Sequence, residues 1–163
     1  MPEIIKVYGL EELARKLKAL PARMTRNALR SGVNAGARLV RDTYKMSVNS
    51  RTGTLRRSIV TKYIRERSND QQAMYYVTAR KGKKLQRLGK RNADAYYAGW
   101  VEFGHKIVPR GGKGTFRARR AAATGTVEGK RWLTRAFESK KLSALDAIKI
   151  RIGQNLAKMA EFK

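Results

Sequence analysis

Apolar residues recur every three or four positions in three stretches of the chain, which is the spacing of an amphipathic helix. The first stretch, residues 10–20, has the stripe Leu10, Leu13, Leu17 and Leu20. The second starts after Pro21, a residue that begins or kinks helices, and runs to about Met46 with the stripe Leu29, Val33, Gly36, Val40 and Tyr44. The third, residues 143–160, has the stripe Leu145, Ile148, Ile152, Leu156 and Met159. The pattern predicts three long helices, and a shorter one over residues 131–139.

Two pairs of small or polar residues add detail to these helices. Gly32 and Gly36 lie one turn apart, where they weaken the helix but let another backbone come close. We interpret them as a tight packing face. Ser143 and Asp146 have the spacing of a capping box, with Asp in place of the usual Glu. The last helix is therefore predicted to begin at Ser143.

Between the helices the pattern changes to β-branched and aromatic residues, which favour strands. Two strands are predicted over residues 55–64 and 71–80, after a turn at Gly53 and with a polar turn between them. A short first strand is predicted over residues 3–9. The order of elements predicts an α+β fold. We expect one domain over residues 1–163, with a small antiparallel sheet packed against a long N-terminal helix and a C-terminal helix.

Two stretches, residues 80–91 and 105–120, contain many cations and no acid. Both are predicted to be extended basic loops, the second continuing to about Lys130. Such cations neutralise a polyanion, either DNA or an acidic protein, without reading base sequence. The alternative is a solvated face. The cations are Arg80, Lys81, Lys83, Lys84, Arg87, Lys90, Arg91, Lys106, Arg110, Lys113, Arg117, Arg119 and Arg120.

The net charge strengthens the expectation of a partner. The chain has 38 Lys and Arg against 12 Asp and Glu, a formal charge of +26, so it repels itself until an anion neutralises it. Nucleic acid is the first expectation, an acidic protein surface the second and an anionic membrane the third. A membrane span or signal peptide is not expected from the apolar pattern. Cysteine is absent, which excludes disulfides and thiolate metal sites.

Residues 95–114 hold the best candidates for chemistry, Glu102 and the single histidine, His105. Their spacing occurs in carboxylate-bridged metal proteins, but those sites need more carboxylates and a second histidine. The chain also lacks a G-x-S-x-G nucleophile motif and a phosphate-binding loop. We therefore expect no enzyme activity and no cofactor, and interpret residues 111–114 as a basic hairpin tip.

The structural reading of this stretch is a packed element. Glu102 is expected to form an ion pair with one of the many cations. Trp100, Val101 and Phe103 are predicted to lie largely in the core. Gly104 is predicted to adopt a positive φ, a conformation that side chains disfavour.

Several motifs occur in a familiar order: residues 9–20, a long Ala-rich helix, residues 51–59, residues 96–105, and residues 131–139 ahead of a last helix. In this the chain resembles the minor tail or tail-completion proteins of long-tailed bacteriophages, the class that includes lambda's protein Z and the similarly placed neck protein of phage HK97. The matching motif positions are Gly53, Leu55, Ser58, Ile59, Tyr97, Val101, Glu102, Phe103 and Gly104. The chain departs from the pattern at His105, where a small residue is usual, and in lacking a proline within residues 126–133.

The resemblance implies a structural neck protein of the virion, assembled in the host cytoplasm, with no enzyme activity. It implies a ring, most simply of six copies, between the head-closure proteins and the tail terminator or tail tube, around the DNA channel. Composition supports an alternative, a free-standing basic nucleic-acid-binding protein. A nuclease is disfavoured because acids and histidines are not clustered.

Overall fold

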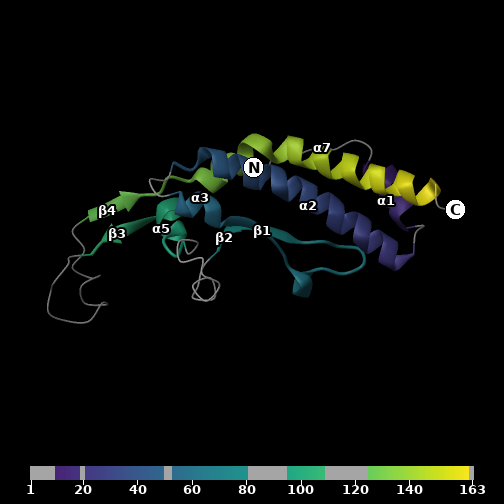
Figure 1. Ribbon diagram of the computed structural model, residues 1–163, viewed down its shortest axis with the longest axis horizontal. Helices are drawn as coiled ribbons and strands as arrows, with labels where there is room; N and C mark the ends of the chain where they lie inside the picture. Colours follow the sequence, from purple (N-terminus) through teal and green to yellow (C-terminus); the bar gives the residue numbers. More distant parts are fainter. Residues whose placement is uncertain (1–9, 19–20, 50–52, 81–94, 109–124, 162–163) are drawn as a thin grey trace. The chain divides into compact units, whose positions relative to one another are not determined.

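The computed structural model describes residues 10–18, 21–49, 53–80, 95–108 and 125–161 (Figure 1). It confirms the predicted α+β class, with long helices and small two-stranded sheets. The elements are α1 (Leu10–Lys18), α2 (Ala22–Ser47), α3 (Thr54–Ser58), β1 (Ile59–Tyr63), the short 3-10 helix η1 (Arg65–Arg67), β2 (Tyr75–Ala79), α5 (Ala98–Phe103), β3 (Gly104–Ile107), β4 (Gly125–Glu128) and α7 (Trp132–Glu161).

The chain forms two compact units. The first unit comprises Met1–Asp42, Thr61–Thr78 and Ser139–Lys163, and the second comprises Thr43–Val60 and Ala79–Glu138. That residues 1–163 behave as one domain stays a prediction. The predicted strand over residues 3–9 lies outside the described residues.

Helices α1, α2 and α7 build the core of the first unit. Leu17, Ala28 and Ile152 are buried at its centre, with Leu13, Leu29, Ile148, Leu156 and Met159 packed around them. All of these residues except Ala28 come from the three apolar stripes of the sequence, so the stripes do face one another. Pro21 precedes the start of a new helix, α2, rather than kinking the first one. Its carbonyl accepts the amide N–H groups of Met24 at 2.9 Å and Thr25 at 3.1 Å, which forms the first turn of α2.

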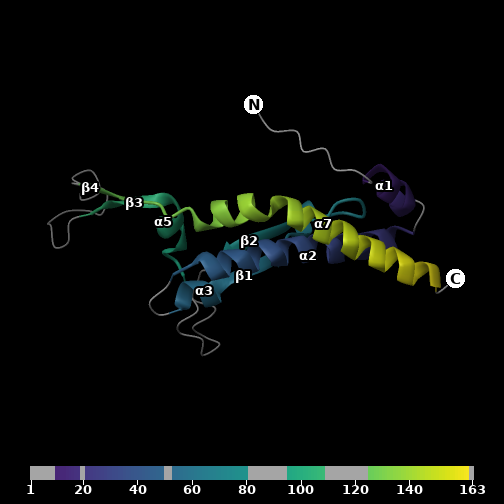
Figure 2. The ribbon, with the colours of Figure 1, turned by 90° about the horizontal axis from the view of Figure 1, so that it is seen from above.

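The glycines of α2 confirm the predicted tight packing face. A Cβ atom at Gly32 would lie 2.5 Å from Cγ1 of Ile152, and one at Gly36 would lie 2.7 Å from Cγ1 of Ile148. Any side chain there would push the two helices apart. Here α2 and α7 run side by side, as both views show (Figures 1 and 2).

The prediction of two separate C-terminal helices was wrong. Residues 132–161 form one continuous helix, α7, and Ser143 lies in its interior rather than capping a new helix. The physical reason is local. Lys140, Lys141 and Leu142 are good helix formers, and residues 132–152 contain no Gly or Pro, so the capping spacing alone does not end the helix.

The strand predicted over residues 55–64 begins later than expected. Residues 54–58 form α3, and β1 starts only at Ile59. Gly53 has a positive φ of 67° and its carbonyl accepts the amide N–H of Arg57 at 3.0 Å, which closes a helical turn where strand was predicted. Ile64 donates to the Met74 carbonyl at 3.0 Å and Arg80 to the Ser58 carbonyl at 2.9 Å. The two strands therefore run antiparallel, as predicted.

A second sheet was missed. β3 pairs antiparallel with β4, with Gly104 opposite Glu128 and Ile107 opposite Gly125. The predicted loop from residue 105 to about residue 130 was therefore wrong at both of its ends. Six of these eight strand residues are exposed, so no apolar alternation marks them in the sequence. The predicted tip, residues 111–114, lies outside the described residues.

Candidate functional site

Few of the predicted polyanion contacts lie in the described part of the chain. Arg80 directly follows β2 and is exposed, with its backbone carbonyl accepting the Ala95 N–H at 3.2 Å. Lys106 is exposed on β3, opposite Thr126. The others lie outside the described residues: Lys81, Lys83, Lys84, Arg87, Lys90, Arg91, Arg110, Lys113, Arg117, Arg119 and Arg120.

The first group of motif residues forms a buried turn in the second unit. Gly53 begins α3, and Leu55, Ser58 and Ile59 are buried behind it. The Ser58 hydroxyl donates to the Leu55 carbonyl at 2.7 Å, so this buried polar group is satisfied locally. This arrangement closes the turn and offers no reactive group to solvent.

Glu102 is the chemical centre of the second group. It lies on α5 and is buried, with 4% of its surface exposed. Both carboxylate oxygens accept the Leu133 N–H at 3.1 Å, and Oε1 also accepts the Thr134 N–H at 3.2 Å and its hydroxyl at 3.3 Å. These amides belong to the first turn of α7, where a helix leaves its N–H groups without internal partners. Glu102 therefore caps α7 from a distant part of the sequence.

The expectation that Glu102 forms an ion pair was wrong for the part of the chain that the structure describes. Its partners there are helix N–H groups and a hydroxyl, not a Lys or Arg side chain. A carboxylate at a helix N-terminus also interacts favourably with the helix dipole. In this arrangement the carboxylate has a structural role, because its described contacts are donors from the first turn of α7.

Gly104 and Gly129 let the chain pass closely over this cap. Gly104 has a φ of 81°, which confirms the predicted positive φ. A Cβ atom at Gly104 would collide with the Val127 carbonyl, and one at Gly129 would lie 2.6 Å from the Phe103 carbonyl carbon. The backbone is also tied here, since Arg131 N–H donates to the Glu102 carbonyl at 3.1 Å.

Tyr44, near the end of α2, is buried close enough to this cap for the charge of Glu102 to act on its phenol. It is 3% exposed. Burial, and secondarily the charge of Glu102, raise the pKa of its phenol from 10.0 to about 12. The phenol therefore stays protonated over the physiological range and acts as a packed, neutral group.

Beside the buried cap, the second unit exposes aromatic rings. Phe103 is 80% exposed and Trp100 is 52% exposed, so the prediction that both are core was wrong, while Val101 is half-buried. Trp100 lies 5.7 Å from the Tyr96 ring, edge-on, and 5.9 Å from the His105 ring. We call Tyr96, Trp100, Phe103 and His105 the aromatic face. On α5 the charged Glu102 points inward and the aromatic rings outward, the reverse of the usual arrangement.

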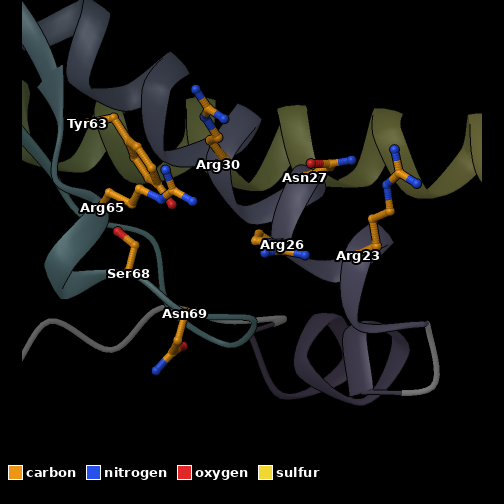
Figure 3. Close-up of a pocket in the computed structure, with 8 residues that line it drawn as sticks. All are labelled: Arg23, Arg26, Asn27, Arg30, Tyr63, Arg65, Ser68 and Asn69. Carbon is orange, nitrogen blue, oxygen red and sulfur yellow. The ribbon is translucent and has the colours of Figure 1, made fainter.

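A second cluster, in the first unit, was missed by sequence reasoning. A pocket of about 540 Å³ is lined from α2 on one side and from the β1–β2 connection on the other (Figure 3). We call it the arginine pocket. Its lining residues are Arg23, Arg26, Asn27, Arg30, Tyr63, Arg65, Ser68 and Asn69. The only signal in the sequence was the spacing of three arginines at i, i+3 and i+7 on α2.

Within the described ranges, no group of three or more His, Cys, Asp or Glu side chains is placed to hold a metal ion. None of the helices described there combines the length and apolar character needed to cross a bilayer.

The described side chains thus form a structural cap and an exposed aromatic face in the second unit, and a basic pocket in the first. Residues 11–104 match the family described as "Bacteriophage HK97-gp10, putative tail-component". Because this match covers more than half of the 163-residue chain, the protein belongs to that family of phage tail components. No match was found among curated proteins or among solved structures.

Proposed function

We propose that this tail component is a neck protein of the lambda protein Z-like class, which completes the tail and joins it to the head. In this role six copies form a ring between the head-closure proteins and the tail terminator or tail tube, around the DNA channel. The family match carries the proposal. Two features of the chain support the finer role: the aromatic face and the charge.

The aromatic face supports assembly with other protein. Large aromatic side chains left in water on a monomer mark contact surfaces, and Trp and Tyr are enriched among the residues that dominate binding energy. Trp100 and Phe103 sit on a helix whose other side is anchored through Glu102 to α7. Rings held by a rigid element lose little freedom when a neighbouring subunit covers them.

The charge supports a place beside DNA. A channel filled with duplex DNA presents closely spaced phosphates, which relieve the self-repulsion of a +26 chain. The cations of residues 80–91 and 106–120 are proposed to make this contact, or to meet an acidic surface on a neighbouring ring. We propose no chemistry for these stretches, because their cations are interleaved with glycine and no acid lies among them.

The alternative, a free-standing nucleic-acid-binding protein, explains the charge equally well. It gives no reason for the family match or for the uncharged aromatic face. The two functions make different predictions for the phage particle.

Deleting the gene tests the proposed function. A neck protein is required for joining, so the deletion is expected to leave DNA-filled heads and separate or malformed tails in electron micrographs. Infectivity is expected to be lost and to return when the gene is supplied in trans. Joined, infectious particles from the deletion would contradict the proposal.

Phe103→Ala tests the aromatic face separately from folding. Since the ring is 80% exposed, we expect the free energy of unfolding to change by less than about 0.5 kcal/mol. We expect joined particles to fall sharply in the same variant. Met46→Ala is the matched control, because Met46 is 73% exposed on α2 and lies outside the aromatic face. Equal yields of joined particles from the two variants would show that the aromatic face does not contribute to assembly.

A further inference from the structure

We propose that the arginine pocket binds adjacent phosphate groups, those of a polyphosphate chain or of a nucleic-acid backbone. The inference rests on the side chains of the first unit alone and does not depend on the neck assignment. It also uses none of the cations of residues 80–91 and 106–120.

The arginines converge on one pocket from two separate parts of the sequence. On α2, Arg23, Arg26 and Arg30 lie on the same face, since residues three, four and seven apart are neighbours along a helix. At 1.5 Å per residue they extend over about 10 Å of helix. Arg65, from η1, faces them across the pocket. This spread matches several phosphates in a row, since one strand of DNA carries a phosphate for every 3.4 Å or so of helix axis.

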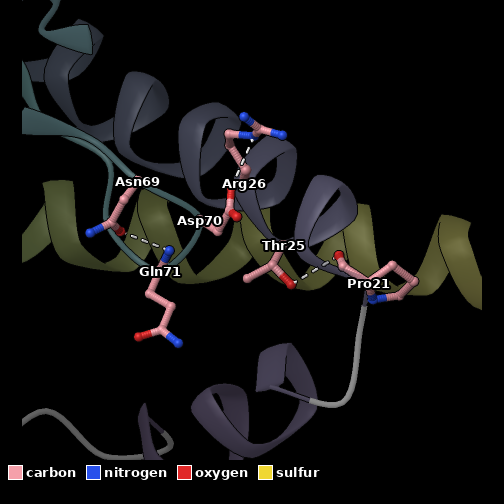
Figure 4. Close-up of polar contacts among 6 residues, drawn as sticks. All are labelled: Pro21, Thr25, Arg26, Asn69, Asp70 and Gln71. Carbon is pink, nitrogen blue, oxygen red and sulfur yellow. Dashed lines mark hydrogen bonds and ion pairs between the residues drawn. The ribbon is translucent and has the colours of Figure 1, made fainter. Parts of the chain in front are cut away.

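Most of this positive charge has no carboxylate partner among the described residues. Arg26 pairs with Asp70 at 3.3 Å, and both side chains are about half exposed (Figure 4). In the described ranges, Arg23, Arg30 and Arg65 have no carboxylate within ion-pair distance. Like charges gathered around one pocket disfavour the empty site, so an anion that enters it is stabilised by all of them.

Packing on an aromatic ring orients one of the guanidinium groups, that of Arg30. The Arg30 guanidinium lies 4.6 Å from the centre of the Tyr63 ring, and Tyr63 packs in turn on Tyr75 of β2 at 5.2 Å. Stacking on a ring holds the planar guanidinium while leaving its N–H groups free to donate at the edge. Such a fork matches the oxygens of a phosphate in a bidentate way, which a lysine does not.

Among the neutral residues of the pocket, Ser68 has a structural role and Asn69 can donate to a bound anion. The Ser68 hydroxyl donates to the Ile64 carbonyl at 2.6 Å and accepts the Met74 N–H at 2.9 Å, so it shapes the wall. Asn69 accepts the Gln71 N–H through Oδ1 at 2.9 Å, which leaves its NH₂ group to donate (Figure 4). The donors that remain are cationic forks and amide N–H groups, which suits an anion rich in oxygen.

A phosphate chain fits this set better than a carboxylate. One carboxylate has two oxygens and one charge, and a single guanidinium fork satisfies it. Three uncommitted forks spread along a pocket are matched by several charges held at a regular spacing, as phosphates in a chain are. Binding would then read no base sequence, because the contacts are to phosphate oxygens.

Three probes test the proposal: tripolyphosphate, a short DNA duplex and polyglutamate, each titrated into the full chain. The pocket variant carries Arg23→Gln, Arg30→Gln and Arg65→Gln. The control variant carries Arg15→Gln, Arg38→Gln and Lys158→Gln, which removes three exposed cations of the first unit that do not line the pocket. Both variants lose three positive charges. A difference in their affinity therefore depends on where the cations lie and not on the net charge.

We expect the pocket variant to bind tripolyphosphate at least tenfold more weakly than the control variant. For the duplex, we compare the slope of log affinity against log salt concentration. We expect this slope to be shallower in the pocket variant than in the control variant by about two to three units, at about 0.9 for each lost phosphate contact. A pocket-dependent effect with the duplex alone identifies a nucleic-acid backbone as the ligand. An effect with tripolyphosphate alone identifies a free polyphosphate or nucleotide.

Two single substitutions keep the test valid if the triple variant does not fold. Arg30→Lys preserves the charge but loses the fork and the stacking, so phosphate affinity is expected to fall severalfold. Asp70→Asn frees Arg26 and removes a negative charge beside the pocket, so affinity is expected to rise about two- to threefold. Asp42→Asn is its control, because Asp42 pairs with Arg41 away from the pocket.

Three results would overturn the proposal. One is equal binding of both phosphate probes by the pocket and control triple variants. Another is pocket-dependent binding of polyglutamate but of neither phosphate probe, which would assign the pocket to an acidic protein. The third is unchanged phosphate affinity in Arg30→Lys and Asp70→Asn.

Discussion

At the scale of single residues, Glu102 shows how backbone N–H groups can stabilise a buried carboxylate, with no Lys or Arg partner in the described part of the chain. Its carboxylate accepts the N–H groups of Leu133 and Thr134 and the Thr134 hydroxyl, so three donors replace water that it has lost. Hydrogen bonds to an ionised group are stronger than neutral ones. Although the chain has 38 Lys and Arg, the partners of this acid among the described residues are helix N–H groups and a hydroxyl.

Glu102→Gln is expected to lower the free energy of unfolding by about 1–3 kcal/mol, because a neutral amide accepts these N–H groups more weakly and turns its own NH₂ toward one of them. Urea unfolding of the two proteins measures the difference. Glu128→Gln serves as the control, since Glu128 is exposed on β4. A loss no larger than that of the control would mean that the carboxylate does not stabilise α7.

The raised pKa of Tyr44 predicts a loss of stability at alkaline pH. Below pH 10 the phenol is protonated in both the folded and the unfolded chain. Between pH 10 and about 12 only the unfolded chain releases the proton, which favours unfolding. The contribution is therefore complete below pH 10 and is lost as the pH rises to about 12.

Thermal unfolding across this alkaline range, for the wild type and Tyr44→Phe, tests the assignment. Tyr44→Phe has no proton to lose, so its melting temperature is expected to fall less steeply as the pH rises. The other tyrosines and lysines titrate in both proteins and cancel in the comparison. Parallel curves for the two proteins would contradict a buried, protonated Tyr44.

At the scale of elements, α7 shows that a capping pattern is not enough to start a helix. A cap acts where the chain before it is not helical. Residues 132–142 are already helical, because Glu102 caps the first turn and no breaker follows. Ser143 is exposed in the middle of α7. At such an interior position Ala has a higher helix propensity than Ser.

Ser143→Ala is expected to raise the free energy of unfolding by a few tenths of a kcal/mol, up to about 0.5. If a helix began at Ser143, the same change would lower it by about 1 kcal/mol, through loss of the cap. The sign of the change, from chemical denaturation, separates the two structures. Ser143→Gly adds a second readout, since Gly is costly inside a helix but nearly neutral at a cap.

At the scale of the whole molecule, two long helices contribute residues to both compact units. The boundary between the units falls after Asp42 within α2 and after Glu138 within α7. A helix is cooperative along its length. We therefore propose that residues 1–163 unfold together, as one domain, and that the two units are not independent modules.

Coincident unfolding transitions are the expected outcome. Both tryptophans, Trp100 and Trp132, belong to the second unit, so their fluorescence reports on that unit. Far-UV circular dichroism is dominated by the long helices α2 and α7, most of whose residues belong to the first unit. Midpoints that agree between the two probes support one domain. Midpoints that differ would divide the chain into two.

The sequence by itself predicted the features that depend on neighbours along the chain. The stripes of α1, α2 and α7, the start of α2 after Pro21, the packing glycines and the positive φ of Gly104 follow from local spacing and backbone sterics. The strands of the first sheet were also visible, because their β-branched residues are contiguous. Each of these signals lies within a few residues of its effect.

Only the tertiary structure decided which face of α5 is buried. Glu102 and Phe103 are adjacent, and hydropathy alone places Phe103 inside. The outcome is reversed because the free N–H groups of α7, thirty-one positions away, bind the carboxylate and turn the aromatic rings outward. The arginine pocket has the same origin, since Arg65 faces Arg23 and Arg30 only after β1 has packed beside α2. Pairings between distant residues depend on how elements pack, and the spacing of residues along the chain does not record that.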